Sequence, residues 1–76
     1  MLKKSKYLDR VEMALAIYNA IQASGYTQAQ VARKMGVNPV VVTRWATGRH
    51  IPDTDSLVHL ADVIKVDVND LLIRKK

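Results

Sequence analysis

Basic residues gather in a part of the chain that has no acidic ones. Between Glu12 and Asp53 the sequence contains no aspartate or glutamate. Four basic residues lie in this interval, namely Arg33, Lys34, Arg44 and Arg49. Guanidinium and ammonium groups placed this way can meet phosphate groups without repulsion from neighbouring carboxylates. With 12 Lys and Arg against 7 Asp and Glu, the formal net charge of +5 indicates an acidic partner, or equally a surface that is basic for solubility.

Catalytic and metal chemistry are not expected. The 76 residues include no cysteine and two histidines, too few for a disulfide framework or a metal-ligand set. His59 lies near Asp55 and Asp62, and without a nucleophile or oxyanion donors this group is a polar helix face. No apolar run reaches the roughly 20 residues of a membrane span, and the first residues lack the apolar stretch of a secretory signal. We therefore expect a cytoplasmic protein that is not an enzyme and has no catalytic residues, cofactor, metal, small-molecule substrate or membrane partner.

A short helix with clear end signals should lie near the centre of the chain. Thr27 and Gln30 have the spacing of a capping box, in which each side chain bonds the other residue's amide. Gly36 can take the left-handed conformation that ends a helix. The pattern predicts a helix over about residues 28–35.

A second short helix should follow after a tight turn. Asn38 is a strong helix cap, and Pro39 suits a first helical position, where no amide is needed. The β-branched run at residues 40–43 would by itself favour a strand. Because the cap and the stop at Gly48 bracket about two and a half turns, we predict a helix over about residues 39–47.

Three further helices are expected around this pair. The first begins near Leu8 and ends before Gly25, with one helical stripe formed by Leu8, Val11, Leu15, Tyr18 and Gln22 and widened by Ala14, Ile17 and Ile21. Another begins at Pro52 and Asp53, with an apolar stripe formed by Leu57, Leu60, Ala61 and Ile64. A last short helix is expected over about residues 68–73, starting at Asp67.

The predicted fold is all-α, a compact five-helix domain over residues 8–73. A basic arm at residues 1–7 precedes it, and a basic tail at residues 74–76 follows. The lysines of the arm, Lys3, Lys4 and Lys6, could grip phosphates or the minor groove, or serve solubility alone.

Small and apolar residues occupy the positions where the two central helices should meet. Two short helices that cross steeply must approach closely. Ala32 is small at the expected contact, and Gly36 lies in the turn. An apolar seal beneath them would be formed by Val31, Met35, Val37, Val42 and Trp45. The separations from Ala32 to Gly36, from Gly36 to Val42 and from Val42 to Trp45 are 4, 6 and 3 residues. The sequence resembles the Cro/CI-type helix-turn-helix family, also called the Xre or lambda-repressor-like family, whose motif has these separations.

The resemblance covers residues 8–73 and implies a DNA-binding domain of lambda-repressor-like fold, acting as a small repressor-like transcriptional regulator. In that family the third helix reads base edges in the major groove and the second spans the backbone. The base-contacting residues it implies are Asn38, Pro39, Val40, Thr43 and Arg44. Arg44 could bond guanine O6 and N7 together, and Val40 could pack against a thymine methyl.

Phosphate contacts are implied on both sides of that helix. Gln28 matches the family glutamine that binds a phosphate and braces the third helix. The other phosphate-contacting residues expected are Thr27, Thr47, Arg49 and His50. Binding to double-stranded DNA would place the protein at the nucleoid.

The family usually acts as a homodimer on operator-like, two-fold symmetric DNA. We expect the dimer surface in the apolar set formed by Val66, Val68, Leu71, Leu72 and Ile73. The same side chains could instead close the core of their own domain.

Some residues depart from the family pattern or have plainer interpretations. Lys65 replaces a usual glycine, Ala46 replaces a common acidic residue, and Pro39 with Val40 makes the start of the third helix apolar. That apolar edge leaves a protein-interaction module as an alternative, and Arg44 alone could be an ordinary surface charge. Within DNA binding, a phage-type repressor, a restriction-modification controller and an antitoxin component of a mobile element remain open.

Overall fold

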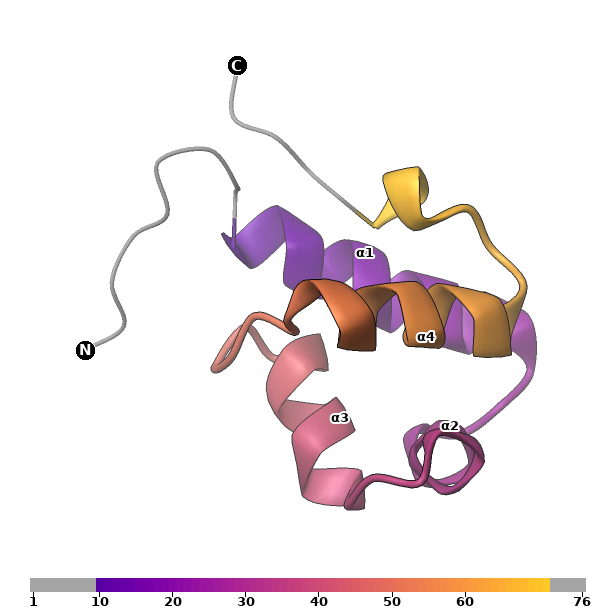
Figure 1. Ribbon diagram of the computed structural model, residues 1–76. Coiled ribbons are helices and arrows are strands. Elements are labelled where there is room, and N and C mark those ends of the chain that lie inside the picture. The colour runs from indigo at the N-terminus through magenta and orange to yellow at the C-terminus, as the bar shows by residue number, and fades with distance from the viewer. Residues whose placement is uncertain (1–9, 72–76) are drawn as a thin grey trace.

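The structure is a computed structural model that describes residues 10–71. Within this part of the chain it is all-helical (Figure 1). The elements are α1 (Arg10–Ser24), α2 (Gln28–Met35), α3 (Pro39–Ala46), α4 (Thr54–Ile64) and a short 3-10 helix, η1 (Val68–Asp70). The expected arm and tail, together with Leu72 and Ile73, lie outside the described residues. None of the described helices is long and apolar enough to cross a bilayer.

The expectation of five α-helices is wrong in its last element. Asp67 caps the segment by accepting a 2.8 Å bond from the amide of Asn69. The amide of Leu71 then donates to the carbonyl of Val68 at 3.0 Å, the three-residue spacing of a 3-10 turn. Leu71 is 1% exposed. A single tight turn is therefore enough to bring this leucine into the core.

The buried face of α1 also differs from the predicted stripe. The helix buries Ala14, Ile17 and Ile21, which the predicted stripe included, and Met13, which it did not. Val11, Leu15 and Tyr18, which were predicted to lie on the same helical stripe, are 67%, 49% and 42% exposed. Apolar residues occupy both faces of this helix, so periodicity alone could not select the face that packs.

Local signals define the ends of α2 as predicted. The Thr27 hydroxyl accepts from the amide of Gln30 at 3.0 Å, and the Gln30 side chain accepts from the amide of Thr27 at 2.8 Å. At the other end Gly36 has φ 74°. This left-handed residue lets the chain leave the helix axis and turn directly into α3.

The β-branched run after Pro39 is helical. Asn38 Oδ1 accepts from the amide of Val40 at 2.9 Å, which starts α3. Val42 is completely buried, and Trp45 is buried one turn later. Burial of these two side chains against the other helices outweighs the weak helix propensity of the valines.

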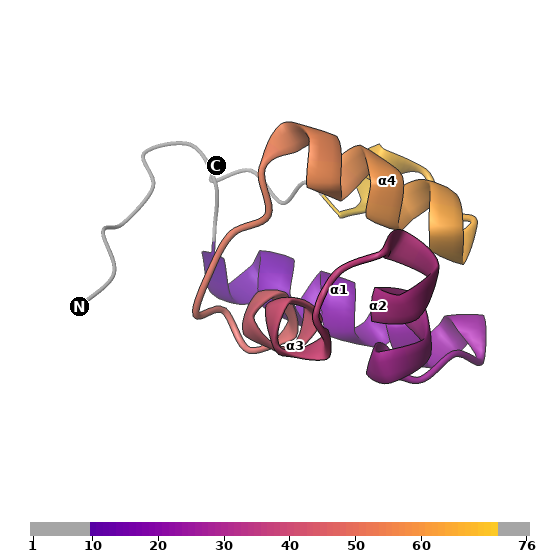
Figure 2. The ribbon, with the colours of Figure 1, turned by 60° about the horizontal axis from the view of Figure 1, so that its bottom comes forward.

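The arrangement of the helices places α2 and α3 at one end of the molecule. Figures 1 and 2 show α1 and α4 running in similar directions, whereas α2 and α3 cross steeply. The two short helices contact each other, and α2 also packs on α4 and α3 on α1. Their buried side chains include Val31, Ala32, Met35, Val42 and Trp45. One core thus supports both helices from beneath and leaves the outer face of α3 exposed.

Candidate nucleic-acid interface

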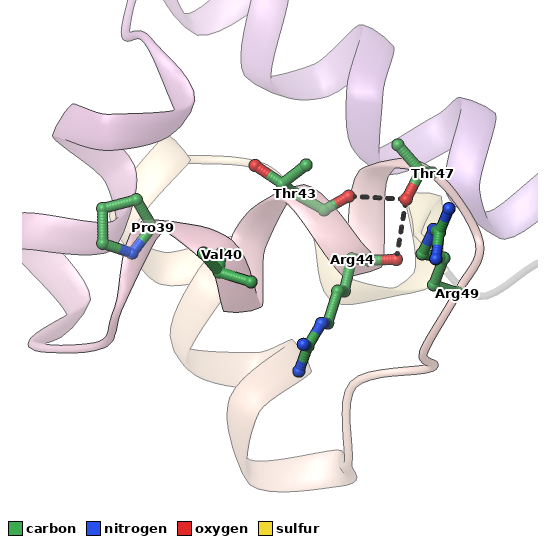
Figure 3. A pocket seen from close by; sticks show the side chains of 6 residues that line it. All are labelled: Pro39, Val40, Thr43, Arg44, Thr47 and Arg49. Carbon is green, nitrogen blue, oxygen red and sulfur yellow. Dashed lines mark hydrogen bonds between the residues drawn. The ribbon is translucent and has the colours of Figure 1, made fainter.

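The outer face of α3 carries the side chains that the sequence assigned to base contacts. Asn38, Pro39, Val40, Thr43 and Arg44 are all exposed. Residues on α3 and the turn after it line a shallow surface pocket, formed by Pro39, Val40, Thr43, Arg44, Thr47 and Arg49. Figure 3 shows these side chains together on one side of the helix.

Arg44 is exposed, and its side chain extends outward from α3 (Figure 3). Its neighbour Trp45 is buried. Arg44 is therefore a surface cation, and Trp45 is a core side chain. The planar guanidinium has five N–H donors and can make two parallel bonds to one acceptor edge. This geometry matches the O6 and N7 edge of guanine.

The start of α3 offers little hydrogen-bonding capacity. Asn38 Oδ1 is used by the amide of Val40, so the Asn38 side chain keeps its NH2 group as a donor. Pro39 has no amide hydrogen. Val40 is 52% exposed, and its apolar side chain can make only van der Waals contacts. This end of the helix is suited to a methyl group rather than to a phosphate.

A hydrogen bond between side chains joins α3 to α2. The Thr43 hydroxyl donates to Gln28 Oε1 at 3.0 Å across 15 sequence positions. Gln28 is partly buried and Thr43 is exposed, so the bond lies at the edge of the α3 surface. Sequence reasoning expected both residues at the site and expected Gln28 to brace α3, but it did not identify Thr43 as the partner of Gln28. The signal that could have found it is their placement on facing surfaces of the helix-turn-helix.

The N-terminal end of α2 keeps donors for an anion. The capping box uses the amides of Thr27 and Gln30. The amides of Gln28 and Ala29 belong to the first turn and have no carbonyl partner within the helix. The Thr27 hydroxyl uses a lone pair for the cap and keeps its hydrogen. Together with the positive end of the helix dipole, these donors can face a phosphate.

Thr47 uses its hydroxyl within the protein. It donates to the carbonyl of Thr43 at 2.8 Å, with a longer contact of 3.4 Å to the carbonyl of Arg44 (Figure 3). A hydroxyl has one hydrogen, and a phosphate oxygen can only accept. A phosphate contact by the Thr47 hydroxyl would therefore require these internal bonds to break.

The turn after α3 is tied to the helix by backbone bonds. The amides of Arg49 and His50 both donate to the carbonyl of Arg44, at 2.9 and 3.2 Å. Gly48 has φ 77°, which permits this reversal. Both side chains are exposed. They are therefore held close to α3 and open to a partner that contacts that helix.

The expected dimer surface loses its central residue. Leu71 belongs to the core, and Val66 and Val68 are partly buried against it. The alternative that these side chains close their own domain holds for Leu71, because its burial leaves nothing for a second chain.

Among the described residues, no group of three or more His, Cys, Asp or Glu could hold a metal ion.

Comparisons with solved structures show where this fold occurs. The restriction-modification controller protein C.AhdI from Aeromonas hydrophila has a TM-score of 0.79 and 19% identity, covering 84% of this chain and 93% of that protein. The clp gene regulator ClgR from Corynebacterium glutamicum has a TM-score of 0.76 and 19% identity, covering 82% and 80%. The SOS-response transcriptional repressor LexA from Eubacterium rectale has a TM-score of 0.79 and 28% identity, covering 100% and 78%.

Sequence comparison gives the family. No curated protein sequence matches the chain significantly. A family model described as Helix-turn-helix matches residues 17–71, from the middle of α1 to Leu71. That span includes the crossed pair α2 and α3, the turn between them and the core beneath. The chain belongs to the helix-turn-helix family of the Xre and Cro/CI type.

Proposed function

We propose that this protein is a sequence-specific DNA-binding transcriptional regulator, with a repressor-like mode of action at an operator in the nucleoid of the cytoplasm. The observation that carries the proposal is the pairing of α2 with an exposed α3 in a family of helix-turn-helix proteins. In this motif the second helix of the pair enters the major groove while the first crosses the backbone. The printed names of the similar structures, a controller protein, a gene regulator and a transcriptional repressor, support the same class.

Charge on the proposed binding face supports an acidic ligand. The exposed residues Arg44, Arg49 and His50 come from a stretch without acidic side chains. A protein that binds apolar peptide through the Pro39 and Val40 edge would not need this distribution. Arg44 and Arg49, which line the same pocket as that edge, favour the polyanionic backbone of DNA over a protein partner.

The proposed contacts divide into two kinds. Arg44 reads guanine, and Val40 packs against a thymine methyl. Gln28, Thr27 and the amides at the start of α2 hold a phosphate on one side of the groove. Arg49 and His50 hold phosphates on the other side. Phosphate contacts of this kind fix the position of the protein on the duplex, and base contacts select the DNA sequence.

Two copies of the chain are proposed to act together. One short recognition helix reads few base pairs, and proteins with this motif reach useful affinity by binding two half-sites roughly 34 Å apart. Sedimentation velocity with and without a selected duplex measures the number of copies bound. A single copy under both conditions would refute the dimer without affecting the proposed DNA binding.

The decisive experiment is selection of bound sites from a pool of random duplexes, followed by binding of the enriched duplex over a range of salt concentrations. We expect enrichment of a two-fold symmetric sequence. We also expect log affinity to fall linearly with log salt, by about 0.9 for each phosphate neutralised. No enrichment together with salt-independent binding would refute the proposal.

A further inference from the structure

The bond between Thr43 and Gln28 connects the two groups that face base and backbone in the proposed function. Thr43 is one turn along α3 from Val40 and lines the same surface pocket as Arg44. Its hydroxyl donates to Gln28 Oε1 at 3.0 Å. The acceptor belongs to the first residue of α2. The bond therefore links a side chain on the recognition face to one at the proposed phosphate site.

We propose that Gln28 sets the hydrogen-bonding polarity of Thr43, that is, whether its hydroxyl donates to a base or accepts from it. As an acceptor, Thr43 selects a base with a major-groove amino group, adenine or cytosine. This inference rests on the proposed function. A free threonine hydroxyl can donate or accept and so discriminates poorly between bases. The Thr43 hydroxyl has given its one hydrogen to Gln28, and only its lone pairs remain. It can accept from adenine N6 or cytosine N4, but it cannot donate to guanine O6 or thymine O4.

The other end of Gln28 explains why this polarity would persist on DNA. With Oε1 turned toward Thr43, the Nε2 group of Gln28 keeps its two hydrogens for another acceptor. A phosphate oxygen accepts and does not donate, so a phosphate at Nε2 holds the amide in this orientation. A backbone contact thereby fixes the reading direction of a base-facing residue. The amides at the start of α2 attract the phosphate to the same place.

The test compares four variants on duplexes derived from the selected operator. The base pair read by Thr43 is the one at which Thr43→Val loses its preference. At that pair we measure the affinity for duplexes with adenine or cytosine on the contacted strand, divided by the affinity for duplexes with thymine or guanine there. The contacted strand is the one on which removal of the amino group of the base weakens wild-type binding. The wild-type ratio should be about tenfold, the effect of leaving one polar group without its partner. Gln28→Leu should bring the ratio close to one, because the freed hydroxyl can donate as well as accept.

Two matched variants separate polarity from loss of a contact. Thr43→Ser keeps the hydroxyl and should keep the ratio. Arg49→Ala removes a proposed phosphate contact elsewhere, so it should weaken binding to all duplexes by a similar factor and leave the ratio unchanged. Thr43 and Arg49 are exposed and Gln28 is outside the core, and circular dichroism should show wild-type helix content in all four variants. A further probe replaces the selected adenine by purine, which lacks the 6-amino group. This duplex should bind wild type about fivefold more weakly and Thr43→Val equally well.

The results that overturn the inference differ from those that overturn the proposed function. Wild-type affinity that does not fall when the amino group of the selected base is removed would mean that the Thr43 hydroxyl does not accept from that group, as expected if the amide has the opposite orientation. An unchanged ratio in Gln28→Leu would mean that Gln28 does not set the polarity. Either result refutes the inference while sequence-specific binding stands. Failure of the wild-type protein to enrich any duplex would instead refute the proposed function, and the inference with it.

Discussion

The backbone amide of Val37 donates to the carbonyl of Ala32 at 2.9 Å, closing the end of α2 with a six-residue reversal. A second bond runs from the amide of Gly36 to the carbonyl of Arg33 at 3.2 Å. The pair forms the Schellman arrangement, which requires a left-handed residue between the helix and the outgoing chain. The direction in which the chain enters α3 therefore depends on Gly36.

Gly36→Ala should lower the free energy of unfolding by about 1 kcal/mol. A Cβ at this position would meet no atom within 4 Å, so the cost is conformational and not steric. The left-handed region penalises alanine, and the reduced entropy of the unfolded chain offsets part of that cost. Urea denaturation followed by circular dichroism measures the change. An unchanged midpoint would show that this turn relaxes without strain.

Lys65→Gly should have the opposite effect. Lys65 has φ 61° at the end of α4 and is the only non-glycine residue with positive φ in the described part of the chain. Glycine there should raise the free energy of unfolding by about 0.5–1 kcal/mol, because it removes the left-handed penalty. Lys65→Ala is the matched control: it removes the charge and keeps the penalty, so its stability should stay near that of wild type. Equal gains from both variants would assign the effect to charge.

Arg44→Ala and Arg49→Ala should weaken DNA binding in different ways. Loss of the Arg44 guanidinium should cost about 1–3 kcal/mol at one base pair and relax the preference there. Loss of Arg49 should weaken all duplexes alike and lower the salt slope by about one. Competition binding with operator duplexes carrying single base changes distinguishes the two. A sharper effect on preference from Arg49 would reverse these assignments.

The proposed contact between Val40 and a thymine methyl can be tested by removing that methyl group. Replacing the thymine at its base pair with uracil removes only the 5-methyl carbon. Burial of one such carbon contributes about 0.8 kcal/mol, so affinity should fall about fourfold. Val40→Ala should bind both duplexes equally, because its shorter side chain no longer reaches the methyl. Equal loss in both proteins would place the methyl contact on another residue.

Asp53 should contribute to the stability of the domain at neutral pH, and this contribution should be lost at acidic pH. The amide of Ser56 donates to the Asp53 carboxylate at 2.8 Å at the start of α4. This bond, with the hydrogen bond to the Ser56 side chain, lowers the pKa of Asp53. A lowered folded-state pKa contributes stability above the unfolded value, about 3.9, and that stability is lost as pH falls through the folded value. Asp53→Ala should therefore have a lower melting temperature at pH 7, and the difference from wild type should shrink toward pH 2. A difference that stays constant over this range would exclude the charge of Asp53 as its cause.

Local sequence signals predicted the parts of the fold that local chemistry determines. The capping box at Thr27 and Gln30, the start at Asn38 and the reversal at Gly36 all use groups within a few residues of one another. Such signals need no tertiary information, which is why the crossed helices could be placed even though a valine run favours strands.

The remaining features depend on contacts between distant residues. The predicted stripe on α1 included both Leu15, which is exposed, and Ile17, which is buried, because the two are equally apolar and only the position of the other helices distinguishes them. The last predicted helix, over about residues 68–73, is instead a 3-10 turn at Val68–Asp70 that places Leu71 in the core. The bond between Gln28 and Thr43 depends on how α2 and α3 cross. Whether the predicted base and phosphate contacts form stays a prediction.

The carbonyl oxygen of Arg44 accepts hydrogen bonds from the amides of Arg49 and His50, and these bonds tie the turn to the end of α3. If α3 enters the groove more deeply or at another tilt, the two side chains behind it must travel with it. If Arg49 and His50 make the proposed phosphate contacts, the depth at which α3 enters the groove and the strength of those contacts should change together. A mutation that re-angles the helix to accommodate a new operator should also change non-specific affinity, so specificity and residence on bulk DNA would evolve together.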